Sequence, residues 1–252
     1  MKYLLSSAVI VLSLCPASSA RADEVSLVAP GGIRAAIEKM IPDFEKKTGH
    51  KVKATFGSGG GTKQEVARGE PFDVPIVQPP YPEVLASGHV VASSETPLAT
   101  VAVAVAVRKG ARKPDISTPE AVKRMLLAAN SVSYPDPAGG AAAGVSFAKT
   151  LATLGIAEQM KPKIKLAQGG AAAMAMLAKG EVEIGLTFLS EMEDPGVDAV
   201  GPLPRAISTP TGLVGFLSTH ARAPEAAKAL LKYLSSSDAA KVYKASGMQP
   251  GR

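Results

Sequence analysis

The feature of this sequence that most limits its fold is the alternation of short β-branched runs with helical patterns. Residues 24–29 (EVSLVA) indicate a strand, and apolar residues within 33–44 then recur at helical spacing. Residues 51–56 (KVKATF) alternate like a half-buried strand, and a later helix in STPEAVKRMLLAA can be capped by Ser117 or Thr118. Further strand-like runs are FDVPIVQ, TVAVAVAV, NSVSY, EIGLTF and GLVGFLS. The alternation predicts α/β layers with mostly parallel sheets, in either one doubly wound domain or two lobes.

Residues 1–22 have the pattern of a secretory signal peptide. Lys2 precedes an apolar run over residues 4–14, and small residues lead to an expected cleavage after Ala22. The run is too short for a permanent membrane anchor. Cys15 could indicate a lipoprotein, but Leu14 stands where a small residue normally precedes such a cysteine. Since Cys15 is the only cysteine, we expect a soluble, disulfide-free mature protein in the periplasm.

Composition and motif spacing argue against several function classes. The basic residues are spread along the chain without aromatic residues between them, so we expect no nucleic-acid partner. No Cys/His spacing typical of zinc is present, and no glycine-rich stretch fits a phosphate loop or a dinucleotide fingerprint. We therefore predict neither a metal nor a cofactor.

Glycine-rich stretches stand where strand-like runs end and helical patterns begin, in APGGIRAAI, GSGGGTKQEV and PDPAGGAAAGVSF, with AQGGAAAMAML as a fourth candidate. The first N–H groups of a helix lack an internal acceptor, and the macrodipole adds about half a positive charge there. Glycine lets an anion approach that backbone closely, although a single glycine turn is also ordinary architecture. Several such turns at the carboxyl ends of strands predict a site for a small anion. The predicted ligand-binding residues are Gly31, Gly32, Ser58, Gly59, Gly60, Thr62, Ala138, Gly139 and Gly140.

Four long stretches resemble the type II periplasmic solute-binding proteins, especially the molybdate-binding proteins of ABC transporters. They are TFGSGGGTKQEVARGEPFDVPIV, DPAGGAAAGVSFAKTLATLGI, AAMAMLAKGEVEIGLTF and PEAAKALLKYLSSSDAAKVYKASGM. The resemblance implies a two-lobed α/β fold, each lobe a mixed, mostly parallel sheet flanked by helices. Lobe I would hold residues 23–105 and 206–252, and lobe II residues 106–205. It also implies a monomer that encloses a small anionic ligand and delivers it to an inner-membrane ABC permease.

The chain departs from the molybdate-binding pattern at three places. Its first loop, Pro30-Gly31-Gly32, has no hydroxyl, and Gly59 stands where the family typically has a second serine. Phe188 stands at the position of the family's tyrosine, so we include it among the predicted ligand-binding residues. Each lost hydroxyl removes a hydrogen bond to a charged group, worth roughly 1.5–3 kcal/mol. The predicted ligand is therefore a small oxyanion or an organic carboxylate.

A second set of stretches resembles the aconitate isomerase branch of the same superfamily: VAPGGIRAAI, RKGARKPDIS, GEVEIGL, LSEM and PGVDAVGPLP. That resemblance implies an alternative activity, a proton shift that moves a double bond in a tricarboxylate. Such a reaction needs a group that takes a proton from one carbon and returns one to another. Glu191 is the catalytic candidate, with Glu65, Tyr134 and Ser58 as others, and a solvated acidic loop is the alternative for Glu191.

Some cationic side chains could pair with ligand carboxylates. Arg34 and Lys63 come early in their predicted helices, where a positive charge is unfavourable unless an anion lies nearby. Lys165 and Arg205 are further candidates, whereas the histidines His50, His89 and His220 are expected at the surface.

Overall fold

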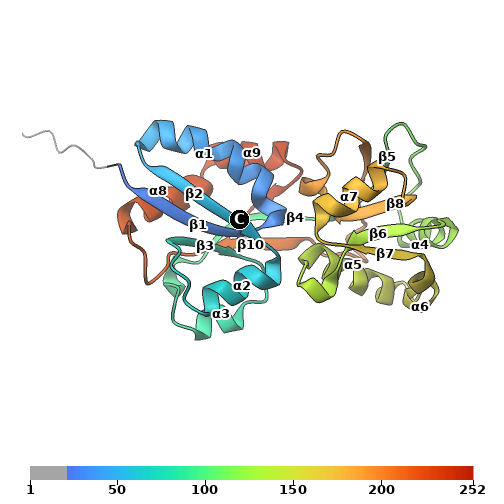
Figure 1. The fold of residues 1–252 in the computed structure, drawn as a ribbon, viewed down its shortest axis with the longest axis horizontal. Helices are drawn as coiled ribbons and strands as arrows, with labels where there is room; N and C mark the ends of the chain where they lie inside the picture. Colours follow the sequence, from blue (N-terminus) through green and yellow to red (C-terminus); the bar gives the residue numbers. More distant parts are fainter. Residues whose placement is uncertain (1–21, 252) are drawn as a thin grey trace, which may run out of the picture.

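The computed structural model describes residues 22–251 and contains two β-sheets side by side, each with helices on both faces (Figure 1). All of the predicted signal peptide except Ala22 lies outside the described residues. Among the described helices, none has the length and apolar character needed to cross a membrane.

Lobe I is built on a six-stranded sheet with the order β11-β4-β10-β3-β1-β2. Strand β1 pairs in parallel with β2 and β3, whereas β10 pairs antiparallel with β3 and β4, and β11 antiparallel with β4. The strands are β1 (Glu24–Pro30), β2 (Lys51–Gly57), β3 (Val74–Val77), β4 (Thr96–Val101), β10 (Thr211–Gly215) and β11 (Gln249–Pro250).

Lobe II is built on a five-stranded sheet with the order β7-β6-β8-β5-β9. Strand β6 pairs in parallel with β7 and β8, and β5 pairs antiparallel with β8 and β9. The strands are β5 (Val103–Arg108), β6 (Val132–Pro135), β7 (Ile164–Ala167), β8 (Ile184–Phe188) and β9 (Val197–Pro202).

The chain passes from one sheet to the other at Ala102, between β4 and β5, and returns over residues 203–210, between β9 and β10. The predicted lobe boundaries, at residues 105 and 205, lie close to these passages and stay a prediction. The sheets are less parallel than the alternation predicted, because β4, β5, β9 and β10, which lead into and out of the passages, run antiparallel to their neighbours.

Helices cover both faces of each sheet. In lobe I, α1, α8 and α9 lie on one face and α2 and α3 on the other, and in lobe II α7 lies opposite α5 (Figure 1). Helix α4 begins where Thr118 Oγ1 accepts the Ala121 N–H at 3.1 Å, so Thr118 rather than Ser117 is the cap. The bounds are α1 (Arg34–Thr48), α2 (Gly59–Ala67), α3 (Pro82–Ala86), α4 (Pro119–Ala128), α5 (Ala142–Thr153), α6 (Ala157–Met160), α7 (Gly170–Ala178), α8 (Pro224–Leu234) and α9 (Ser237–Ala245).

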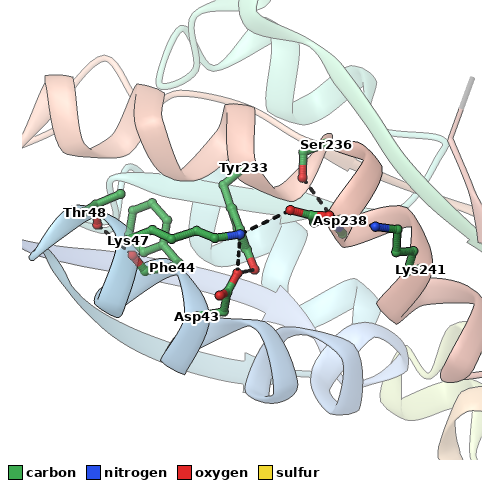
Figure 2. A network of polar contacts seen from close by, with 9 residues as sticks. Asp43, Phe44, Lys47, Thr48, Tyr233, Ser236, Asp238 and Lys241 are labelled. Atoms are coloured by element: carbon green, nitrogen blue, oxygen red, sulfur yellow. Dashed lines mark hydrogen bonds and ion pairs between the residues drawn. The ribbon is translucent and has the colours of Figure 1, made fainter.

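A polar network fixes the two C-terminal helices against α1 (Figure 2). Tyr233 of α8 donates its hydroxyl to Asp43 Oδ2 at 2.7 Å, and Lys47 Nζ contacts Asp43 at 2.8 Å and Asp238 of α9 at 3.1 Å. Burial, together with the hydrogen bond to Asp43, raises the pKa of Tyr233 to about 12. Because the charged groups are about half exposed, the network contributes more to the placement of the helices than to stability.

A buried carboxylate joins three segments of lobe I. Asp73, which precedes β3, accepts hydrogen bonds from the Ser26 N–H at 2.7 Å and the Ser26 hydroxyl at 2.6 Å. It also accepts the N–H groups of Arg222 at 2.6 Å and Ala223 at 3.3 Å, just before α8. Burial alone would raise the pKa of Asp73, but these hydrogen bonds outweigh it and hold the pKa below its ordinary value.

We expect Asp73→Asn to lower the free energy of unfolding at pH 7 by at least about 1.5–3 kcal/mol. The substitution removes a charged acceptor, and it places the amide N–H₂ group opposite backbone N–H groups, which are also donors. The stabilisation by Asp73 is present above its unfolded pKa and is lost as the pH falls through the lower folded pKa. Urea denaturation of both proteins should therefore show a difference that shrinks below about pH 4. Asp115→Asn, at an exposed turn, is the control. An unchanged stability in Asp73→Asn would contradict this assignment.

Candidate functional site

A cavity of about 710 Å³ lies between the lobes, and we call it the interlobe cavity. All four glycine-rich stretches of the sequence reach its wall. Lobe I contributes the residues before α1 and α2, and lobe II contributes those before α5 and α7, so four helix starts face one space. Its lining includes Gly31, Gly32, Arg34, Ser58, Gly59, Gln78, Ala141, Ala142, Gly169, Gly170, Phe188 and Glu191.

The structure brings together most, but not all, of the predicted site residues. Those that line the interlobe cavity are Gly31, Gly32, Ser58, Gly59, Gly139, Phe188 and Glu191. Gly60, Thr62, Ala138 and Gly140 are not part of the lining. Thr62 lies one turn into α2 and is fully buried, and its hydroxyl oxygen would lie 3.4 Å from a Cβ on Gly57, the last residue of β2. Ligand binding by the residues in the lining stays a prediction.

The start of α2 shows how the backbone donors are used. Ser58 Oγ accepts the Gly61 N–H at 3.1 Å, and the Gly60 N–H donates to the Gly140 carbonyl at 3.0 Å. The first turn has the N–H groups of Gly59, Gly60 and Gly61. Of these, only the Gly59 N–H group has no hydrogen-bond acceptor among the described residues, and Gly59 lines the cavity. An N–H group at a helix start is a donor suited to an anionic ligand.

Three polar contacts cross from one lobe to the other around the interlobe cavity. The first is the Gly60–Gly140 hydrogen bond, where the two backbones approach so closely that a Cβ on Gly60 would lie 3.1 Å from the Gly140 Cα. The second joins the Ser190 hydroxyl to the Gly32 carbonyl at 2.7 Å. The third is an exposed ion pair between Lys39 and Glu193 at 2.9 Å. The structure therefore has its lobes closed on one another.

Glu191 ends the short 3₁₀ turn that follows β8, and its partly buried side chain lines the cavity. Its Oε1 faces lobe I, since a Cβ on Gly31 would lie 3.3 Å away, and its Oε2 accepts the Thr187 hydroxyl. At the start of α7, a Cβ on Gly170 would overlap this carboxyl group. Glu191 thus occupies the junction of two helix starts, rather than the solvated loop that was the alternative.

Burial raises the pKa of Glu191 above its ordinary value, although hydrogen bonds from Thr187 and the Phe188 backbone and the charge of Arg34 act in the opposite direction. A carboxyl group with a raised pKa in a cavity wall is a candidate for proton exchange with a bound molecule. Of the other candidate bases, Tyr134 is buried against Phe147, with ring centroids 4.9 Å apart, and neither Tyr134 nor Glu65 lines the cavity.

Arg34 is the only basic residue in the described lining of the cavity. Its guanidinium lies 4.7 Å from the centre of the Phe56 ring, and its half-exposed side chain is 4.0 Å from Glu38. The other predicted cationic contacts lie outside the lining: Lys63 donates to the Pro80 carbonyl at 2.8 Å and Lys165 to the Glu181 carbonyl at 2.8 Å, and Arg205 is exposed.

Sequence reasoning missed Gln78, a buried residue in the cavity wall directly after β3. The signal that could have identified it is its place at the carboxyl end of a strand, the edge at which ligands bind in open α/β sheets. It also missed the pairing of two histidines away from the cavity, where His89 Nδ1 lies 2.8 Å from His220 Nε2.

Comparison with known proteins places these features in context. A family model for a bacterial extracellular solute-binding protein matches residues 25–249. The chain is 36% identical over 234 residues to a Pseudomonas sp protein named aconitate isomerase, covering 90% of this chain and 87% of that protein. It is 31% identical over 254 residues to the molybdate-binding protein ModA of Azotobacter vinelandii, covering 98% of each.

Two solved structures of binding proteins match this chain in fold. The periplasmic molybdate-binding protein of Azotobacter vinelandii matches with a TM-score of 0.75 at 20% identity, covering 89% of this chain and 98% of that chain. A phosphate-bound ABC transporter substrate-binding protein from Clostridium perfringens matches with a TM-score of 0.72 at 13% identity, covering 91% of this chain and 100% of that chain. The predicted two-lobed α/β fold with mixed sheets is confirmed.

The raised pKa of Glu191 predicts how stability depends on pH. As the pH rises above the ordinary pKa of 4.5, the unfolded state loses this proton before the folded state does, so Glu191 lowers the free energy of unfolding. We expect Glu191→Gln, which cannot titrate, to become progressively more stable than the original protein as the pH rises above 4.5, until the folded carboxyl group also ionises. Urea denaturation at a series of pH values measures the difference, with Glu181→Gln, at an exposed position outside the cavity lining, as control. A difference that is constant or shrinks with rising pH would contradict the burial of this carboxyl group.

The close approach of Gly60 and Gly140 predicts that a side chain at residue 60 keeps the lobes apart. We expect Gly60→Val to increase the radius of gyration in small-angle X-ray scattering and to weaken anion binding, with little loss of thermal stability. Gln64→Val introduces the same side chain on the exposed face of the same helix and should leave both properties unchanged. If Gly60→Val is as compact as Gln64→Val, the contact does not control closure.

Proposed function

This chain belongs to the bacterial extracellular solute-binding proteins, and from that premise we propose that it captures a small organic carboxylate between its lobes for delivery to a membrane ABC permease. The observation that carries the proposal is the convergence of four helix starts, two from each lobe, on the interlobe cavity. Their N–H groups and dipoles favour a negatively charged ligand without a metal. Because both lobes contribute, an anion bound there would stabilise the closed state.

The lining of the cavity favours a carboxylic acid over a tetrahedral oxyanion. The serine and tyrosine hydroxyls that the molybdate-binding pattern would supply are replaced at Gly31, Gly59 and Phe188. Arg34, the first residue of α1, could pair with a second carboxylate of the ligand.

The relatives support an anionic ligand and a role in transport. Several matching proteins carry names or titles that refer to molybdate, phosphate or sulfate, and two of these titles describe ABC transporter components. Delivery from such a protein requires export, which the predicted signal peptide would provide, so we place the protein in the periplasm. The permease would recognise the surface formed when the lobes close.

A second candidate function is isomerisation of an unsaturated tricarboxylate, and the position of Glu191 is the observation that favours it. The carboxylate of Glu191 would take a proton from a carbon next to a ligand carboxylate, and the resulting negative charge would spread onto that carboxylate near the helix-start N–H groups. Return of the proton to the far carbon of the allylic system would shift the double bond. The relative named aconitate isomerase supports this candidate. The described lining, however, has no feature that distinguishes an isomerase from a binding protein.

A ligand panel tests the proposed function. A ligand that binds only the folded protein at a hundredfold excess over Kd adds about 2.7 kcal/mol of stability. In thermal-shift measurements with molybdate, tungstate, sulfate, phosphate, citrate and the two aconitates, we expect a carboxylate to raise the Tm most. Arg34→Gln should reduce that shift, and Arg205→Gln at an exposed position should not. Molybdate as the most stabilising ligand would refute the carboxylate assignment.

Chromatography of purified protein incubated with either aconitate separates the two candidates. A transporter component would leave the acid unchanged, whereas an isomerase would convert one isomer into the other. If conversion is seen, Glu191→Gln should slow it by about 10²–10⁴-fold, the usual contribution of a general base. Conversion that survives this substitution would exclude Glu191 as the base.

A further inference from the structure

Gln78 is a buried polar residue whose side chain has no hydrogen-bond partner among the described residues. It is the first residue after β3, only 3% of its surface is exposed, and it lines the interlobe cavity. Within residues 22–251, neither its side-chain nitrogen nor its side-chain oxygen forms a hydrogen bond. Buried polar groups are nearly always paired, so a buried amide with two unpaired atoms at a cavity wall points to a bound partner.

The neighbouring glycines leave room for this amide at the helix starts of lobe I. A Cβ on Gly59 would overlap Gln78 Oε1, and a Cβ on Gly32 would lie 3.8 Å from Gln78 Nε2. The Gln78 amide therefore lies between the loops that begin α1 and α2, beside the Gly59 N–H group. A ligand held by those helix starts would reach Gln78 as well.

The chemistry of the amide restricts the ligand. A primary amide offers N–H donors on one side and a carbonyl acceptor on the other. A fully ionised oxyanion or carboxylate can accept from the N–H₂ group, but it has no hydrogen for the carbonyl oxygen and repels it. A ligand with an O–H group beside its carboxylate satisfies both.

We propose that Gln78 contacts the ligand and selects carboxylic acids that carry a hydroxyl group next to a carboxylate. This inference rests on the proposed function and adds the chemical class of the acid. It assigns Gln78 a specificity role that the helix starts cannot perform, because their N–H groups only donate.

Matched pairs of acids test the proposal, since each pair differs by one hydroxyl group: citrate against tricarballylate, and malate against succinate. Titration calorimetry at pH 7.5 should show that the original protein binds the hydroxylated member of at least one pair about tenfold or more tightly, as expected for one additional hydrogen bond to a buried group. Gln78→Leu and the unbranched Gln78→Met should bind both members of the pair with equal affinity.

The Tm of the ligand-free variants separates a ligand contact from a structural role. Because the amide has no hydrogen-bond partner in the described part of the chain, its replacement by an apolar side chain of similar size should leave the Tm unchanged or raise it. A lower Tm in both variants, with the original preference between acids retained, would overturn the proposal. So would binding of both members of each pair with equal affinity by the original protein, although the proposed function would then stand. Failure of the original protein to bind any of the four acids would refute the proposed function and this inference together.

Discussion

The constraint on which this structure depends is the need to satisfy N–H groups at four helix starts that face one cavity. An α-helix leaves its first N–H groups without internal acceptors, and here α1 and α2 of lobe I meet α5 and α7 of lobe II across the same space. Glycine recurs at these starts because the backbones, the Gln78 amide and the Glu191 carboxyl group approach more closely than a Cβ would allow. The same close packing leaves the helix-start N–H groups beside a cavity whose described lining has one basic residue, Arg34, and four acidic residues, Asp136, Glu191, Glu193 and Asp194.

Glu191 adds a titratable carboxyl group to the cavity in which we expect an anionic ligand to bind. Burial favours its protonated form, while Thr187 and Arg34 favour the ionised form. A protonated Glu191 could donate a hydrogen bond to a ligand, and an ionised one could accept a proton from it. Binding and proton transfer would use the same cavity, so a carrier and an isomerase could differ by little more than the position of a ligand carbon relative to this carboxyl group.

Local sequence signals predicted the elements well, because strand alternation, helical spacing and glycine depend on neighbouring residues. Strand β1, helix α1 with its end at Gly49, and the four helix starts follow from such signals. The arrangement in two lobes was implied by resemblance, since periodicity does not specify which strands pair. The positions of Glu191 and Gln78 and the burial of Thr62 depend on the packing of the folded chain, which no local pattern encodes.

The central claim is that backbone N–H groups at the helix starts hold the ligand. Nuclear magnetic resonance of the ¹⁵N-labelled protein, titrated with citrate, observes those groups directly. We predict that the amide signals of Gly32, Gly59 and Gly170, which belong to both lobes, move together and saturate with one Kd. If these three signals remain fixed while citrate binds, and the changes are confined to surface lysine and arginine segments, the claim is wrong.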